Sequence, residues 1–161
     1  MIVRALNARD ADAMARIHAT SFDKGWSPLD MAVHVSRDLC LGTGDPLSGF
    51  AILRRSDIDA EILTVATDPA CRRRGHAGAL LEAAREQLKR DSLRHIFLEV
   101  AEDNEAARAL YERLGYQPIG RRPAYYARPD GRVAAVTYAL DLSGNRSTHP
   151  PASLDEATTA R

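Results

Sequence analysis

The stretch from Val65 to Leu81 joins a short apolar strand, a basic turn that contains glycine and the first turn of an amphipathic helix. The first four N–H groups of a helix have no partner inside it, and the helix dipole adds roughly half a positive charge there. Gly75 and Gly78 let an anion approach the backbone closely. This stretch predicts a phosphate or diphosphate site; the alternative is a solvated basic turn that only starts a helix.

The charge balance narrows the class of ligand. The chain has 22 basic and 22 acidic residues and a formal net charge of zero, which disfavours a general nucleic-acid-binding protein. Basic residues do gather locally, at 72–74 and 121–122, as a small anionic ligand would require. We therefore expect no direct nucleic-acid partner.

The sequence carries no sign of a membrane span or a secretory signal. No apolar run of about 18 residues occurs, and the N-terminus lacks a basic region followed by an apolar stretch. Cys40 and Cys71 have no metal-binding or redox spacing, which is typical of reduced cytosolic thiols. We expect a cytoplasmic protein without a membrane partner.

The periodicity of apolar residues predicts alternating strands and helices. Residues 77–88 carry one apolar stripe at helical spacing, residues 96–100 alternate as a strand, and 107–114 form a second helical face that Gly115 ends. Two further helices are expected, one over 11–21 with Asp10 as its cap and one that starts at Ser27-Pro28. A turn is expected over Gly42–Pro46. Strands are expected over 2–6, 47–53 and 61–67 and on both sides of Arg128–Gly131.

These elements predict an α/β fold with a mixed, mostly antiparallel central sheet and helices on both faces. The 161 residues suffice for one domain with a sizeable core, which we place at residues 1–142. Residues 143–161 are rich in Ser, Thr, Pro and Ala without periodicity, which predicts a disordered tail.

Two nucleotide-binding motifs are absent, namely the Walker P-loop and the Gly-x-Gly-x-x-Gly fingerprint. Instead, Arg72-x-x-Gly75-x-Ala77 follows a strand that ends in Thr67-Asp68-Pro69. This pattern resembles the acetyl-CoA loop of the GNAT (GCN5-related) N-acetyltransferases, in which loop N–H groups hold the CoA diphosphate. The segments 97–100, 104–116, 121–126 and 130–132 are similar to RimI-type ribosomal-protein-alanine N-acetyltransferases, and the likeness covers about residues 2–142.

The resemblance implies a GNAT fold and transfer of acetyl from acetyl-CoA to the α-amine of a protein N-terminus, most directly the N-terminal alanine of a small-subunit ribosomal protein. Two alternatives stay open: a lysine or small-molecule amine acetyltransferase of the same fold, and a non-catalytic acyl-CoA sensor. The residues that the resemblance places on acetyl-CoA are Val65, Ala66, Thr67, Arg72, Arg73, Arg74, Gly75, His76, Ala77, Gly78, Asn104 and Tyr111.

Acetyl transfer to an amine needs a base for the amine proton and an acid for the leaving thiolate. Glu99 lies mid-strand on the face opposite Ile96 and Leu98, where it is either a base at a cleft or an exposed residue of a half-solvated sheet. Tyr111 is either an aromatic residue at the edge of the core or a proton donor. The resemblance implies that Glu99 is the general base, acting through water, and Tyr111 the general acid.

Two further positions, Asn104 and His76, need individual comment. Asn104 is either the cap of the following helix or a contact to the pantetheine arm, and both roles are compatible. His76 replaces the aliphatic residue usual in the family and is expected as a partly exposed helix-start residue, which leaves the packing of the loop in question. The other histidines have no mutual ligand spacing, so we predict no metal.

Aromatic residues are the main candidates for the site that binds the acceptor. In the family, the acceptor groove lies between the first two helices and the late hairpin. Trp26 and Tyr126 are candidates for lining that groove, with ordinary packing as an equal alternative. Asp23 or Glu61 is a candidate partner for the acceptor ammonium or for a basic acceptor residue.

Overall fold

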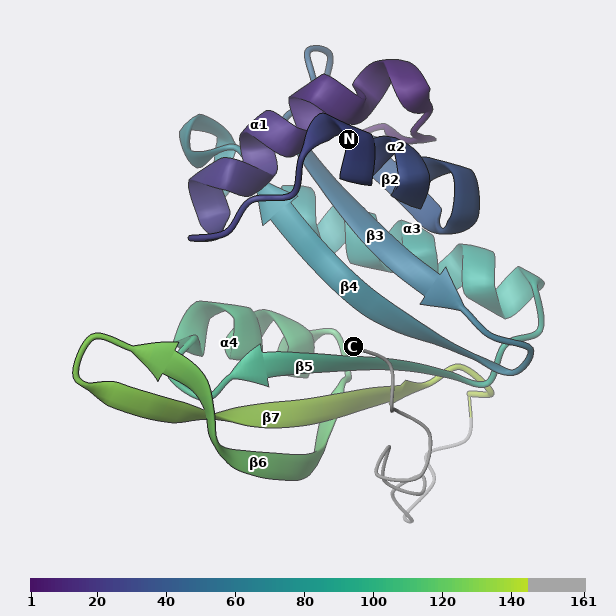
Figure 1. Cartoon of the computed structure of the whole chain (residues 1–161). Coiled ribbons are helices and arrows are strands. Elements are labelled where there is room, and N and C mark those ends of the chain that lie inside the picture. The colour runs from purple at the N-terminus through teal and green to yellow at the C-terminus, as the bar shows by residue number, and fades with distance from the viewer. Residues whose placement is uncertain (145–161) are drawn as a thin grey trace. The chain divides into compact units, whose positions relative to one another are not determined.

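The computed structural model describes residues 1–144 and divides into two compact units, Met1–Leu93 and a second from Arg94 onward (Figure 1). The predicted tail falls mostly on residues 145–161, which lie outside the described residues. The first unit contains, in chain order, β1 (Val3–Ala5), the 3₁₀ turn η1 (Ala8–Asp10), α1 (Ala11–Ser21), α2 (Pro28–Arg37), β2 (Leu39–Thr43), β3 (Gly49–Arg55), β4 (Asp59–Thr67), the 3₁₀ turn η2 (Pro69–Cys71) and α3 (His76–Arg90).

The first unit has helices on both faces of four antiparallel strands in the order β1-β2-β3-β4. Alternation along β3 sends Phe50 and Ile52 into a core shared with α1 and α2. Ala51 and Leu53 are also fully buried and point to the other face, where α3 lies (Figure 1). The amphipathic stripe predicted for α3 is confirmed, because Leu80, Leu81, Ala84 and Leu88 are its buried residues.

The second unit is a three-stranded antiparallel sheet with one helix. It contains β5 (His95–Ala101), α4 (Glu105–Arg113), β6 (Gln117–Arg128) and β7 (Gly131–Asp141), with β7 between β5 and β6. The buried Tyr138 of β7 joins α4 to the sheet: its hydroxyl donates to Glu112 Oε1 at 2.7 Å and accepts from Arg108 Nε at 3.0 Å. The predicted hairpin across Arg128–Gly131 is confirmed.

Two local expectations were wrong. The turn expected over Gly42–Pro46 begins only after Thr43, because Gly42 belongs to strand β2, which the periodicity did not reveal. A Cβ at Gly42 would clash with Leu6 and Leu47, so glycine is there for close packing rather than for a turn. Asp10 makes no side-chain cap for α1; its carboxylate accepts from Asn7 N at 2.9 Å and stabilises the preceding 3₁₀ turn.

The start of α2 agrees with its sequence signature. Ser27 Oγ accepts from Asp30 N at 3.1 Å, and Asp30 Oδ2 accepts from Ser27 N at 2.8 Å, which is a complete capping box ahead of Pro28. Among the helices within residues 1–144, none is long and apolar enough to cross a membrane.

Candidate active site

The loop between β4 and α3 presents open backbone N–H groups. Gly75 caps α3 in the left-handed region, with φ of 85°, and offers no side chain to the helix. The first helical hydrogen bond at this end runs from Ala79 N to Gly75 O at 3.0 Å, so the N–H groups of His76, Ala77 and Gly78 precede it. A Cβ at Gly75 would meet no atom within 4 Å. The loop therefore has the geometry and the space for an anion.

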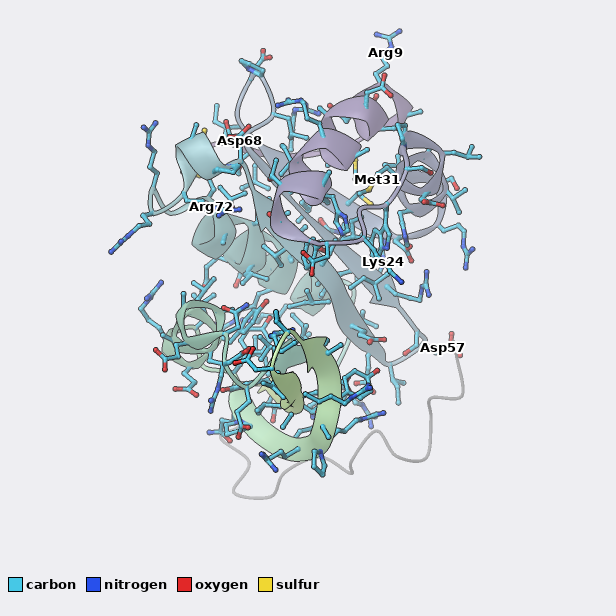
Figure 2. All side chains as sticks on the ribbon, turned by 60° about the vertical axis from the view of Figure 1, so that its left-hand side comes forward. Arg9, Lys24, Met31, Asp57, Asp68 and Arg72 are labelled. Atoms are coloured by element: carbon cyan, nitrogen blue, oxygen red, sulfur yellow. The ribbon has the colours of Figure 1, made fainter. Side chains whose placement is uncertain are left out.

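The three loop arginines differ in their surroundings. Arg72 Nε donates to Thr67 O at 3.3 Å and Arg72 Nη2 to Ser21 Oγ at 3.2 Å, so this side chain braces the loop against the end of β4 and of α1 (Figure 2). Arg73 adopts a left-handed φ of 61°, which costs an L-residue roughly 1–2 kcal/mol. Arg73 and Arg74 are exposed and supply the positive charge that faces solvent at this loop.

His76 anchors the start of α3 to the sheet. Its Nδ1 lies 2.9 Å from the hydroxyl of Thr43, a fully buried residue at the end of β2. The ring is half-buried, as expected for a residue at the start of the helix. A hydrogen bond here takes the place of the aliphatic packing usual in the family, and the loop keeps its open N–H groups.

Glu99 is half-buried on β5 and ion-paired. Its carboxylate Oε1 lies 2.9 Å from Arg122 Nε, and the Glu99 side chain is 20% exposed. Strand alternation turns it away from Leu98 and from the face where Tyr138 meets α4. Glu99 is thus neither a freely solvated residue nor an isolated buried charge.

Tyr111 lies inside the second unit, at 9% exposure. Its ring contacts Tyr116 edge-on at 5.6 Å and Tyr138 at 6.2 Å between centroids. Burial, and secondarily the negative charge that Tyr126 can carry, raises the pKa of Tyr111 to about 12. The phenol is therefore protonated throughout the neutral range, as a general acid must be before it reacts, while the raised pKa makes it a weaker proton donor than an exposed tyrosine.

The position of Tyr126 depends on a bulge in strand β6. The β6–β7 register shifts between Arg122 and Tyr126, and Ala124 adopts a left-handed φ of 52°. Arg132 holds the bulge, because its Nε donates to Ala124 O at 2.8 Å and its Nη2 to Tyr125 O at 3.2 Å. Burial, and secondarily the charge of Glu99, raises the pKa of Tyr126.

Asn104 makes the expected helix cap. Its Oδ1 accepts from Ala107 N at 3.2 Å at the start of α4, just beyond the end of β5. The side chain is exposed, so capping leaves its amide NH₂ group accessible to a ligand.

Trp26 is enclosed by two histidines. Its indole stacks on His18 at 4.6 Å and on His34 at 4.7 Å, and its backbone N–H donates to His18 Nδ1 at 3.1 Å. Because both ring faces are covered, a substrate can meet only the edge of Trp26. The two acidic candidates for the acceptor, Asp23 and Glu61, are both exposed.

The buried His18 makes folding pH-dependent. Burial, and secondarily the charge of His34, lowers the pKa of His18 from its ordinary 6.5. Between the lowered value and 6.5 the unfolded chain binds more protons, so the stabilisation that neutral His18 provides is complete above about pH 6.5 and is lost as the pH falls. We expect the free energy of unfolding to decrease from pH 7 to pH 5, measured by urea unfolding, and His18→Phe to flatten that slope. An unchanged slope in His18→Phe would contradict this assignment.

Arg122 and Arg132 have no individual role that was predicted from the sequence, although they lie in the segments 121–126 and 130–132 that are similar to RimI-type enzymes. Their contacts depend on the register of the strands and on the bulge in β6, and neither can be predicted from a short stretch of sequence. Within residues 1–144, no group of three or more His, Cys, Asp or Glu side chains is arranged to hold a metal ion.

A model of the acetyltransferase (GNAT) family matches residues 11–116, and the chain belongs to this family. The chain is similar to the [ribosomal protein bS18]-alanine N-acetyltransferase of Escherichia coli, with 37% identity over 97 residues that cover 60% of this chain and 66% of that enzyme. It is 33% identical to N-alpha-acetyltransferase RimI of Mycobacterium tuberculosis, over 77% of this chain and 83% of the relative.

The fold comparison agrees. The crystal structure of the ribosomal-protein-S18-alanine N-acetyltransferase from Escherichia coli superimposes with a TM-score of 0.81 and 30% identity, covering 92% of this chain and 98% of that one. The predicted GNAT-like α/β fold and RimI-type resemblance are confirmed. The predicted enzyme class, an acetyl-CoA-dependent N-acetyltransferase, is confirmed at the level of the family.

Proposed function

We propose that this protein transfers acetyl from acetyl-CoA to the α-amine of a protein N-terminus, with the N-terminal alanine of a small-subunit ribosomal protein as the acceptor. The observation that carries the acceptor class is the similarity to two enzymes named for N-terminal acetylation, at 37% and 33% identity. A ribosomal acceptor places the proposed activity in the cytoplasm. We assign it to residues 1–142 as one acetyltransferase domain.

The binding of acetyl-CoA is assigned to three segments. The N–H groups of 75–78, with the exposed Arg73 and Arg74, suit the diphosphate, and Arg72 keeps the loop in place. The backbone of Val65–Thr67 on β4 suits the pantetheine amides, in the manner of a sheet that accepts one more strand. Asn104 offers its remaining amide donors to the same arm.

The proposed chemistry is direct attack of the neutral α-amine on the thioester carbonyl. Glu99 takes the amine proton through a water molecule, and Tyr111 gives its phenol proton to the leaving thiolate. An α-amine titrates near pH 7.7–8.0 and a lysine near 10.4, so a carboxylate of modest basicity suffices for the N-terminal acceptor. Exchange of protons with solvent then restores the Glu99 carboxylate and the Tyr111 phenol. Tyr126 and the edge of Trp26 are the residues proposed to contact the acceptor.

The test is transfer from acetyl-CoA to two peptides, one with a free N-terminal alanine and one with a blocked α-amine and an exposed lysine. We expect product only from the first. Activity only on the lysine peptide would overturn the N-terminal assignment. Binding of CoA without transfer to either peptide or to small amines, unchanged in Glu99→Gln/Tyr111→Phe, would instead indicate an acyl-CoA sensor.

A further inference from the structure

Arg122 makes a contact that spans three strands. Its Nε lies 2.9 Å from Glu99 Oε1, yet β7 separates β6, which carries Arg122, from β5, which carries Glu99. Neighbouring strands lie about 4.8 Å apart, so the two backbones are roughly 10 Å apart. Only a long side chain that crosses the middle strand can make this pair.

The middle strand, β7, carries small side chains where the Arg122 side chain crosses it. Thr137 of β7 lies opposite Glu99 on one side and opposite Gly120 on the other, and Ala135 lies opposite Arg122. Alternation puts all of these positions on one face of the sheet. Because Thr137, Ala135 and Gly120 are small, the guanidinium of Arg122 can reach Glu99 across them.

The guanidinium also meets the aromatic residues at the bulge. Its central carbon lies 5.7 Å from the centroid of the Tyr125 ring, and that ring packs perpendicular to Tyr126 at 5.0 Å. The bulge that places both tyrosines is held by Arg132. The guanidinium of Arg122 therefore lies between the proposed base and Tyr125, whose ring packs against Tyr126, a residue proposed to contact the acceptor.

We propose that Arg122 is a positioning residue for acetyl transfer, whose guanidinium orients the Glu99 carboxylate and disfavours the protonated form of the acceptor amine beside it. This inference rests on the proposed function. A carboxylate alone would attract the acceptor as an ammonium ion, which cannot attack the thioester. A fixed cation at the same carboxylate opposes a second positive charge, so the neutral amine is favoured.

Arg122→Gln tests the charge directly on the Ala peptide. We expect the rise of kcat with pH to move upward by about one pH unit, since a nearby like charge shifts a pKa by one unit or more. At neutral pH this corresponds to an approximately tenfold lower kcat, with KM for acetyl-CoA unchanged. Arg122→Lys, which keeps the charge, should restore most of the activity and the wild-type pH profile.

Arg121→Gln is the matched control. Arg121 is the preceding residue, and its guanidinium pairs with Glu102 through two contacts of 2.9 Å. We expect wild-type kcat and an unshifted pH profile from this variant. Thermal unfolding of all variants, measured alongside, separates a loss of folding from a loss of chemistry.

A double variant decides whether Arg122 acts through Glu99. If it does, Glu99→Gln/Arg122→Gln is no slower than Glu99→Gln alone at about pH 9.5, where the α-amine is neutral and the direct effect of the Arg122 charge on it is absent, whereas independent effects would multiply. An Arg122→Gln enzyme with the wild-type pH profile, or multiplicative losses in the double variant, would overturn the inference while the proposed function stands. A wild-type protein that acetylates neither peptide would overturn both.

Discussion

Tyr111→Phe should lower kcat by about 100-fold or more, while KM for acetyl-CoA changes little. The substitution removes one hydroxyl and keeps the ring that packs against Tyr116 and Tyr138, so the second unit should retain its packing. The loss falls on kcat because the proton is delivered only as the thiolate leaves. Steady-state kinetics on the Ala peptide, with both substrates varied, measures the effect.

Tyr116→Phe is the control for this prediction. Tyr116 belongs to the same aromatic cluster and is 3% exposed, but it has no assigned role in proton transfer. Nearly full activity is expected from it. Equal losses in the two variants would mean that the cluster matters for packing alone and that Tyr111 is not the acid.

The raised pKa of Tyr111 adds a pH signature. The phenol is favoured in its protonated form by burial, so its contribution to stability is complete below the ordinary value of 10 and is lost as the pH rises from 10 to about 12. Unfolding measured from pH 9 to 11 should therefore show a decline that is smaller in Tyr111→Phe. An identical decline in the variant would argue against this origin.

Glu99→Gln should lower kcat/KM at pH 7 by about 100-fold. Glutamine keeps the size of the side chain but cannot accept the proton of the amine. The loss should shrink towards pH 9, because the α-amine, which titrates near 7.7–8.0, then arrives already neutral. A pH profile of kcat/KM for the Ala peptide reports both features.

Glu102→Gln provides the comparison for the Glu99 variant. Glu102 lies just beyond β5, is more exposed than Glu99, and pairs with Arg121 instead of Arg122. Its substitution should leave the profile unchanged. If Glu99→Gln were as active as the wild type at pH 7, the base would have to be another group.

The features that sequence predicted well are local ones. The cap by Asn104, the capping box at Ser27 and the stop at Gly115 each depend on residues a few positions apart, and each is found where expected. Gly75 belongs to the same group of local features, because it lies at the start of α3 as the sequence predicted. The buried face of α3 was predictable in the same way, because the spacing of apolar residues along a helix indicates which of its faces is buried.

The features that sequence missed depend on residues far apart. The pairing of Glu99 with Arg122 requires the register of three strands and the small residues of β7. The enclosure of Trp26 requires α1 and α2 to bring two histidines onto its faces. Gly42 was misleading because glycine is a turn signal and also a means of close packing, and only the positions of Leu6 and Leu47 distinguish the two.

The enclosure of Trp26 also gives the protein a built-in optical reporter. The chain has one tryptophan, so all of its indole emission comes from the segment between α1 and α2. Protonated imidazole quenches a stacked indole, and both faces of this indole carry a histidine. The fluorescence of the unlabelled protein should thus follow the protonation of His18, whose pKa burial lowers, and should report a peptide that binds next to Trp26.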